Sequence, residues 1–301
     1  MDLTVIIATY NGEKYIKQQL LSIYNQTVFA NKVIISDDCS TDNTVQLIKE
    51  FIQSYSLSDN WTLITSEKNV GWRKNFQKLL LTVDTDWILF CDQDDYWLPN
   101  KIELFKKAFI TSNAEVVCAN FNEEIDVNGN KSFFKSIKTI KKNKIRFNHM
   151  NIELRVPGWN MGINKKIVPL LMDIWKDVPD TGHDNIVWLI GVVHNSIYYI
   201  PEVTGNWRKH CESAIFKEHN SNHSKRKNRI DTVNNELVLL ETFLSNSDNL
   251  ITRKKNYIMN IIKNDRKRIE ILENKSVYQF VKSMFSYKSF YYLLGDFKYL
   301  F

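Results

Sequence analysis

The sequence predicts an α/β fold with a mostly parallel sheet flanked by helices, followed by a C-terminal helical extension. Apolar, β-branched runs alternate with segments of helical periodicity along the first 125 residues, a pattern typical of parallel sheets. Of the 301 residues, 44% are hydrophobic and 13% aromatic, which is enough for a large core and excludes a disordered chain. Residues 216–301 hold 16 Lys and Arg against 9 Asp and Glu, whereas residues 1–215 are nearly balanced. We therefore expect an α/β domain over 1–215 and a basic, aromatic-rich helical extension over 216–301.

Each element of the first half has its own local signal. Short apolar runs predict buried strands at 3–9, 32–36, 61–66, 86–91 and 115–121. Apolar side chains at helical spacing predict helices within 11–27, 41–55 and 73–83, and a further helix that begins near Pro99.

The second half has weaker signals. We expect a turn at 126–132, a basic solvated loop at 135–147, a loop leading into a helix at 155–168, a helix at 181–193 and a strand at 196–203. Beyond Lys217 the pattern is helical and charged as far as Lys275, and an aromatic tail follows at 276–301.

Polar clusters follow three of the predicted strands. They are Thr9-Tyr10-Asn11, Asp37-Asp38, and Asp92 with Asp94 and Asp95. Ligands of open α/β sheets bind beyond the carboxyl ends of the strands, so we expect the clusters to line one crevice. Helix capping is the alternative for each cluster, and it suits Asp42 well. It does not explain three acidic residues within four positions.

Crowded carboxylates need a compensating cation or hydrogen-bond donors. Mg²⁺ or Mn²⁺ with substrate phosphate is the simplest partner for Asp92, Asp94 and Asp95. The chain lacks an EF-hand loop, a GxGxxG turn after the first strand and a Walker A motif. Its four cysteines form no CxxC pair, and no nucleic-acid-binding motif accompanies the basic charge.

Four ordered segments carry a family resemblance. "TVIIATYNGEKYI", "VIISDDCSTDNT", "NVGWRKNF" and "DWILFCDQDDYW" together resemble the nucleotide-sugar glycosyltransferases of family 2, which have the GT-A fold. The "DQDDYW" form resembles rhamnosyltransferase-type members that build bacterial surface polysaccharide. The resemblance covers roughly residues 1–215. It implies inverting transfer of rhamnose or another hexose from a UDP- or dTDP-sugar to a glycan or lipid-linked glycan acceptor.

The resemblance also implies donor-side roles. Nucleotide contacts are expected from Thr9, Tyr10, Asn11, Asp37, Asp38, Gly71, Arg73 and Asp92. Asp37 is either a ribose contact or a structural partner, and Arg73 is either paired with Asp38 or a phosphate, or solvated. Asp94 is the expected metal ligand and Asp95 the donor-sugar contact.

Acceptor-side roles follow from the later segments. Asp184, near the start of a predicted helix, is the expected general base or else a plain N-cap, and His183 stands where many relatives have Glu. Arg208 and His210 are expected at the diphosphate, and His210 is also a candidate metal ligand. Trp159 either stacks on an acceptor sugar or belongs to the core.

The sequence also allows alternative functions and several partners. A catalytically inactive sugar-nucleotide or glycan-binding module of the same fold is the main alternative. A processive synthase would require several membrane-spanning helices and a QxxRW motif, which the sequence lacks. Without a signal peptide we expect a cytoplasmic protein. We expect its tail either to dock on an anionic membrane at the inner face or to pack on the catalytic domain or on a second subunit as a homodimer.

Overall fold

The computed structural model describes residues 2–127, 131–137, 143–147, 156–209, 225–247, 250–284, 287 and 290–299. The chain forms two compact units. The first contains Met1–Met172 and Gly182–Ser213, and the second contains Asp173–Thr181 and Ala214–Phe301. All three strand-end clusters belong to the first unit.

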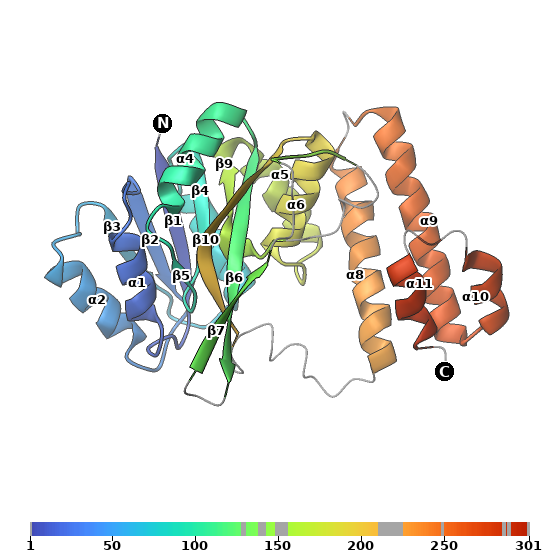
Figure 1. Ribbon diagram of the computed structural model, residues 1–301, viewed down its shortest axis with the longest axis horizontal. Helices are drawn as coiled ribbons and strands as arrows, with labels where there is room; N and C mark the ends of the chain where they lie inside the picture. Colours follow the sequence, from blue (N-terminus) through green and yellow to red (C-terminus); the bar gives the residue numbers. More distant parts are fainter. Residues whose placement is uncertain are drawn as a thin grey trace. The chain divides into compact units, whose positions relative to one another are not determined.

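The first unit is built on one sheet, which has ten strands among the described residues (Figure 1). The strands are β1 Leu3–Thr9, β2 Lys32–Asp37, β3 Trp61–Thr65, β4 Trp87–Asp92, β5 Tyr96–Trp97, β6 Val116–Val127, β7 Lys131–Ile137, β8 Lys144–Ile145, β9 Met161–Asn164 and β10 Ile197–Lys209. Their order is β3-β2-β1-β4-β9-β6-β10-β5, with β7 on β6 and β8 on β10. Strands β3, β2, β1 and β4 are mutually parallel, as are β6 and β10. The predicted α/β fold is confirmed.

Helices cover both faces of this sheet. They are α1 Ile16–Tyr24, α2 Thr44–Ser54, α3 Trp72–Thr82, α4 Lys101–Ser112 and α6 His183–His194. Helix α5, Val168–Asp177, begins in the first unit and ends in the second. Helices α1, α2 and α4 lie on one face (Figure 1), where Leu20 and Phe105 join Leu3 in one core. On the other face the ring of Phe76 in α3 lies 5.9 Å from that of Phe90 in β4. Because both faces are covered, β1, β2 and β4 are mostly buried and mostly apolar, and each fully buried apolar side chain contributes about 1.5–3 kcal/mol.

Two segments differ from the sequence prediction. Strand β9 lies where we expected a loop, and it pairs antiparallel with both β4 and β6. Strands β7 and β8 lie at the two ends of the predicted basic loop. Strand β7 forms an antiparallel ladder with the long β6, and β8 pairs antiparallel with β10. An unpaired stretch of β6 would leave backbone donors and acceptors without partners, and the returning chain satisfies them. The expectation of loops at these two places was wrong.

The second unit is helical wherever the structure describes secondary structure in its C-terminal part. It contains α8 Lys225–Ser245, α9 Thr252–Asn274, α10 Val277–Ser283 and α11 Phe290–Phe297. A buried ionic network ties α8, α9 and α11 together. Asp296 in α11 accepts from Arg229 and Arg268, each at 2.8 Å, and Arg268 also donates to Asp265 at 2.8 Å. Losing one member of such a network is costly because it leaves a buried charge uncompensated.

None of the helices in the described part of the chain combines the length and the apolarity that crossing a bilayer requires.

Candidate active site

Three carboxylates meet at the end of β4. Five of its six residues are buried, and the strand ends at Asp92. Ligand oxygens of Asp92, Asp94 and Asp95 all lie within 4.8 Å of one another. Asp95 is 1% exposed; its Oδ1 accepts the Arg208 amide at 2.9 Å, whereas its Oδ2 has no hydrogen-bond partner. A buried carboxylate oxygen in this state is a natural ligand for a cation.

The electrostatics of this cluster support the same conclusion. Burial, followed by repulsion from Asp94 and Asp184, raises the pKa of Asp92 to about 8. Burial, followed by repulsion from Asp94 and Asp92, raises the pKa of Asp95 well above its ordinary value. Added positive charge would favour the ionised carboxylates. An all-oxygen, acidic ligand set of this kind fits Mg²⁺ or Mn²⁺.

Arg208 borders the cluster from the end of β10. Its guanidinium donates to the Asp94 carbonyl at 2.9 Å, to Gln18 at 2.7 Å and to Glu124 at 3.3 Å. The same group lies 4.7 Å from the ring centre of Tyr15. The residue expected at the diphosphate is therefore held beside the carboxylates. His210 lies outside the described residues.

The ends of β1 and β2 are joined by hydrogen bonds. Thr9 donates to Asp37 at 3.0 Å, and Asp37 also accepts the Ser40 amide at 2.8 Å. Asn11, at φ +47°, receives the Thr41 amide at 2.8 Å and donates its own amide to Ser40. Thr9 and Asp37 are buried at 2% and 1% exposure. Of the two roles expected for Asp37, these bonds support the structural one.

Tyr10 connects this edge to the carboxylate loop. Its amide donates to the side chain of Gln93 at 2.8 Å, and the Gln93 amide group donates back to the Tyr10 carbonyl at 3.0 Å. The Tyr10 ring is 44% exposed and so has area to offer a ligand. A β-carbon on Gly12 would lie 2.4 Å from the Gln93 side chain, so only glycine admits this pairing.

Asp38 holds the loop that precedes α3. Its carboxylate is 1% exposed and accepts the amides of Val70 and Gly71 at 2.7–3.1 Å. Gly71, at φ +87°, is the N-cap residue of α3. Arg73 stacks on Trp72, with its guanidinium carbon 4.3 Å from the ring centre. The described bonds of Asp38 thus go to the loop backbone rather than to Arg73.

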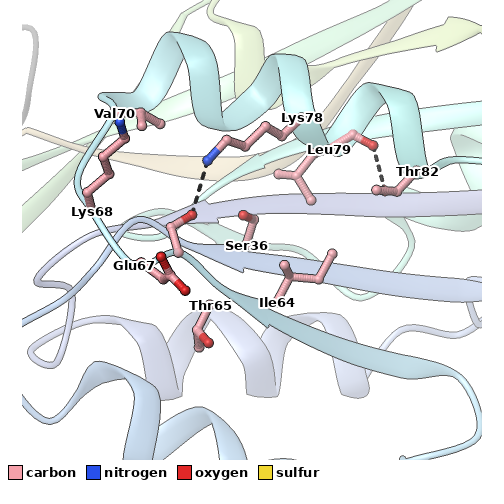
Figure 2. A pocket seen from close by; sticks show the side chains of 10 residues that line it. Ser36, Ile64, Thr65, Glu67, Lys68, Val70, Lys78, Leu79 and Thr82 are labelled. Atoms are coloured by element: carbon pink, nitrogen blue, oxygen red, sulfur yellow. Dashed lines mark hydrogen bonds between the residues drawn. The ribbon is translucent and has the colours of Figure 1, made fainter.

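A pocket of about 480 Å³ adjoins this loop (Figure 2). Lys78 of α3 crosses it to donate to Ser66 at 3.2 Å, and Val70 contributes to its wall. None of the three clustered carboxylates is among the described residues that line it. The pocket therefore belongs to the β3–α3 side of the site and is separate from the carboxylate cluster.

Asp184 stands in the first turn of α6. It accepts the Asn185 amide at 2.9 Å, as a carboxylate near a helix N-terminus should. Burial raises its pKa to about 6, against the Asn185 hydrogen bond and the positive charge of Arg73. Its charge also acts on Asp92, as noted above. The expected base is thus within electrostatic reach of both the cluster and Arg73.

His183 explains the departure from the common Glu-Asp pair. Its imidazole ring stacks on Phe90 with centres 4.3 Å apart and lies 4.7 Å from the ring of Phe76. Burial lowers the pKa of His183 to about 3, so the ring is neutral at pH 7. An ionised Glu would be costly in these aromatic surroundings, whereas a neutral imidazole packs there.

Trp159 lies in the core, which is the second of its two expected roles. It is 1% exposed, and its ring centre lies 5.8 Å from that of Phe121. A β-carbon on Gly205 would come within 2.6 Å of the indole, so that glycine makes room for it. A buried indole offers no face to a sugar, so of the two expected roles for Trp159 the structure supports the core one.

The sequence prediction missed several residues that build the site. Gln93, Ser40, Lys101 and Asn160 all make the hydrogen bonds that hold its parts together. Gln93 had a local signal, because it stands between the clustered acids. Lys101 and Asn160 carry no signal in the sequence, since their partners are remote along the chain, and Ser40 joins the nearby Asp37 to the remote Asn11.

The geometry agrees with the comparison to known families. A family model described as "Glycosyl transferase family 2" matches residues 4–168, more than half of the chain. The chain belongs to this family. The predicted resemblance is confirmed, and the matched region includes the strand-end clusters.

Curated relatives resemble part of this family 2 domain. dTDP-rhamnosyl transferase RfbG of Shigella flexneri is 41% identical over 117 residues, which are 38% of this chain and 40% of RfbG. Poly(ribitol-phosphate) beta-N-acetylglucosaminyltransferase TarS of Staphylococcus aureus is 36% identical over 100 residues, which are 32% of this chain and 17% of TarS. The matches therefore span less than half of each relative.

Solved structures resemble nearly the whole chain. The structure of TarS 1–349 has a TM-score of 0.61 at 19% identity and covers 99% of this chain and 80% of TarS 1–349. The complex of TarS 1–349 with UDP-GlcNAc has a TM-score of 0.59 at 17% identity, and the match covers 99% of this chain and 92% of the TarS chain. The mannosyltransferase PcManGT from Pyrobaculum calidifontis, solved with GDP-Man and Mn²⁺, has a TM-score of 0.50 at 12% identity, covering 99% and 84%. At these identities the likeness concerns the fold, and the predicted GT-A-type fold is confirmed.

Proposed function

We propose that the protein is an inverting glycosyltransferase that moves a sugar from a nucleotide-diphosphate sugar to a saccharide or lipid-linked saccharide of bacterial surface polysaccharide. The observation that carries the proposal is the cluster of Asp92, Asp94 and Asp95 with the charge of Asp184 acting on it. A metal-ligand set beside an independent carboxylate base is what single displacement at an anomeric carbon needs. The likeness to RfbG favours dTDP-rhamnose as donor, and the likeness to TarS favours a UDP-hexose.

The donor nucleotide would lie over the ends of β1 and β2. The exposed Tyr10 ring supplies stacking area, and Asn11, Gly71 and Arg73 border the same edge. Thr9, Asp37 and Asp38 would act mainly by holding these groups in place, because their described hydrogen bonds are made within the protein. Asp92 would contact the ribose and Asp95 the donor sugar.

The leaving group requires positive charge. A divalent cation held by Asp94 would supply Lewis-acid stabilisation of the departing diphosphate. Arg208, already fixed beside the Asp94 carbonyl, would add a permanent positive charge at the same place. His210 would extend this basic segment, in keeping with its place in the sequence just after β10.

The acceptor hydroxyl requires a base. Asp184 would take its proton as the oxygen attacks the anomeric carbon from the face opposite the leaving group, so that the configuration inverts. Its raised pKa of about 6 suits this task, because the carboxylate is ionised at pH 7 yet more basic than an ordinary aspartate. No covalent intermediate is needed.

A donor panel tests this proposal. We expect dTDP-rhamnose or one of UDP-glucose, UDP-galactose and UDP-GlcNAc to raise the Tm with Mn²⁺ but not with EDTA, and to release nucleoside diphosphate slowly without acceptor. At one hundred times Kd the stabilisation should be about 2.7 kcal/mol. Binding without any hydrolysis or transfer would favour the inactive-module alternative, and no binding to any donor would contradict a donor site altogether.

We further propose that the second unit attaches to an anionic membrane, which would bring the site to a lipid-linked acceptor. Tyr278 and Val281 of α10 are 76% and 55% exposed, and Lys282 is exposed beside them. The single acidic residue of α10 and α11, Asp296, is buried by its arginine partners. An exposed surface of apolar and basic side chains suits anionic lipid headgroups.

Vesicle co-sedimentation tests membrane attachment with the full chain. Truncation at Asn274 would remove Asp296 and leave buried arginines uncompensated, so point variants are the cleaner choice. Tyr278→Ser with Val281→Ser should weaken binding to phosphatidylglycerol vesicles at least ~10-fold, given about 1.5–3 kcal/mol for each buried apolar side chain. Leu81→Ser, at a 71% exposed position of α3, is the matched control and should bind as the parent does. Equal binding by the parent and the double variant would contradict the proposed surface.

A further inference from the structure

Lys101, the first residue of α4, has an unusual environment. It is 0% exposed, although lysine is almost never fully buried unless it is paired. Its ammonium group lies 4.3 Å from the ring centre of Trp97, 4.4 Å from that of Trp159 and 5.6 Å from that of Phe105. Aromatic faces around a desolvated cation offset part of the cost of burying it.

Both side-chain hydrogen bonds of Lys101 go to one short segment. Its Nζ donates to the Trp159 carbonyl at 3.0 Å and to Asn160 Oδ1 at 2.9 Å. The same Asn160 oxygen accepts the Thr204 hydroxyl at 2.7 Å, and the Asn160 amide group donates to the Ala119 carbonyl at 2.7 Å. The 3-10 turn Gly158–Asn160 is thereby tied to α4, to β6 and to β10.

The other end of this turn touches the proposed base. A β-carbon on Gly158 would lie 2.4 Å from His183 Nε2 and 3.3 Å from the Asp184 β-carbon. The turn is therefore packed directly against the start of α6. A displacement of its backbone toward α6 would have to move His183 or Asp184 with it.

Lys101 also acts on the opposite side of the site. Its charge opposes the pKa rise of both Asp92 and Asp95, so it stands within electrostatic reach of the carboxylate cluster. Burial lowers the pKa of Lys101 itself to about 7. In its protonated form this one side chain serves two halves of the site: it partly offsets the crowded carboxylates, and it holds the turn that borders Asp184. An apolar residue of similar length could fill the space but could not donate to the two oxygens.

We propose that Lys101 is a positioning residue, which fixes the Gly158–Asn160 turn and thereby the placement of Asp184 relative to the carboxylate cluster. Lys101 touches no substrate in this scheme. Its kinetic consequence rests on the proposed function, whereas its effect on the turn and on the start of α6 does not.

Hydrogen–deuterium exchange tests the structural half without any substrate. In Lys101→Met, amides of 158–163 and of the first turn of α6 should exchange roughly 10- to 100-fold faster, the range expected when hydrogen bonds to a charged group are lost. Peptides from β1 and β2 should be unchanged. Lys107→Met removes a charge from an exposed position of the same helix and should exchange as the parent does. Unchanged exchange at 158–163 and at α6 in Lys101→Met would overturn the proposal.

The kinetic half compares Lys101→Met with Asn160→Ala. A misplacement of about 1 Å can cost 10²-fold in rate, so each variant should lose roughly that factor in the kcat of transfer while KM and Kd for the donor change less than about 3-fold. Both variants release the same turn, so their effects should not multiply. The kcat of the double variant should be within about 3-fold of that of the slower single variant. Fully multiplied losses, or a loss of donor affinity that matches the loss of kcat, would overturn the positioning role.

The two experiments still test the role of Lys101 if the parent protein is inactive or if Lys101→Met does not fold. If the parent protein transfers no sugar, the proposed function fails and the exchange experiment still decides what Lys101 does. If Lys101→Met does not fold, Asn160→Ala carries both measurements, because it removes one of the two acceptors of Lys101 and leaves the cation in place. Parent-like exchange and parent-like kcat in Asn160→Ala would then overturn the proposal.

Discussion

Asp94→Asn is expected to lower sugar transfer by about 10³-fold and to abolish metal-dependent nucleotide binding while leaving the fold intact. Loss of a metal ligand removes several kcal/mol of transition-state charge stabilisation, and each 1.36 kcal/mol is a factor of ten in rate. The fold should persist, because Asp94 is half-buried and the variant keeps both its shape and the backbone carbonyl that accepts from Arg208. Steady-state kinetics, Mn²⁺ titration and thermal unfolding measure the three effects.

The matched control for this variant is Asp59→Asn. It also removes one carboxylate, but from an exposed position after α2, and it should transfer sugar as the parent does. The Tm of Asp94→Asn should equal or exceed that of the parent, since one member of a group of mutually repelling acids becomes neutral. Full activity of Asp94→Asn in EDTA would rule out the metal role.

The first half of the fold could be predicted because its information is local. The runs of β1, β2 and β4 are mostly apolar and β-branched or aromatic, which indicates strands covered on both faces. Parallel strands bring their carboxyl ends to one edge, so the polar residues that follow them had to meet. The carboxylate cluster is the outcome of that topology together with the "DQDD" segment.

The second half depends on partners that are distant along the chain. Strand β9 is four residues long and lies between β4 and β6, so its pairing follows from two strands that precede it by tens of residues. Trp159 is buried because Gly205 leaves room for its indole, a fact that neither residue indicates alone. The burial of Lys101 could not be predicted for the same reason. Lysine is usually exposed, and here it is buried only because the rings of Trp97, Phe105 and Trp159 surround it in the folded protein.

The acidic pair Asp37-Asp38 illustrates a different limit. Its position at the end of β2 puts it at the carboxyl edge of the sheet, as predicted, but a carboxylate there can serve a ligand or the protein backbone. Both residues are buried and accept backbone amides, Asp37 from Ser40 and Asp38 from Val70 and Gly71. Backbone donors near strand ends need such acceptors, and the sequence alone does not show whether an acidic residue there accepts backbone amides or binds a ligand.

Asp184→Asn should have the second large effect, on chemistry rather than on donor binding. Asparagine has the same shape and can still accept the Asn185 amide, but it cannot take a proton. General base catalysis contributes about 10²–10⁴-fold, so transfer should fall within that range. The Kd for the donor should change less than about 3-fold, because the donor contacts come from other elements. Asp180→Asn, at an exposed position just before α6, is the control.

The pH profile distinguishes a base from a structural aspartate. The folded-state pKa of Asp184 is raised to about 6 by burial, so the carboxylate is protonated below that value and ionised above it. The kcat of the parent should therefore fall about ten-fold per unit as pH drops below 6 and level off above it. In Asp184→Asn this acidic limb should vanish from the residual rate. Stability should move in the opposite direction from activity: ionising a buried carboxyl is unfavourable, so the neutral variant should unfold at or above the parent's Tm at pH 7. A variant that retained the acidic limb, or that lost donor affinity as much as it lost kcat, would assign the proton transfer to another residue.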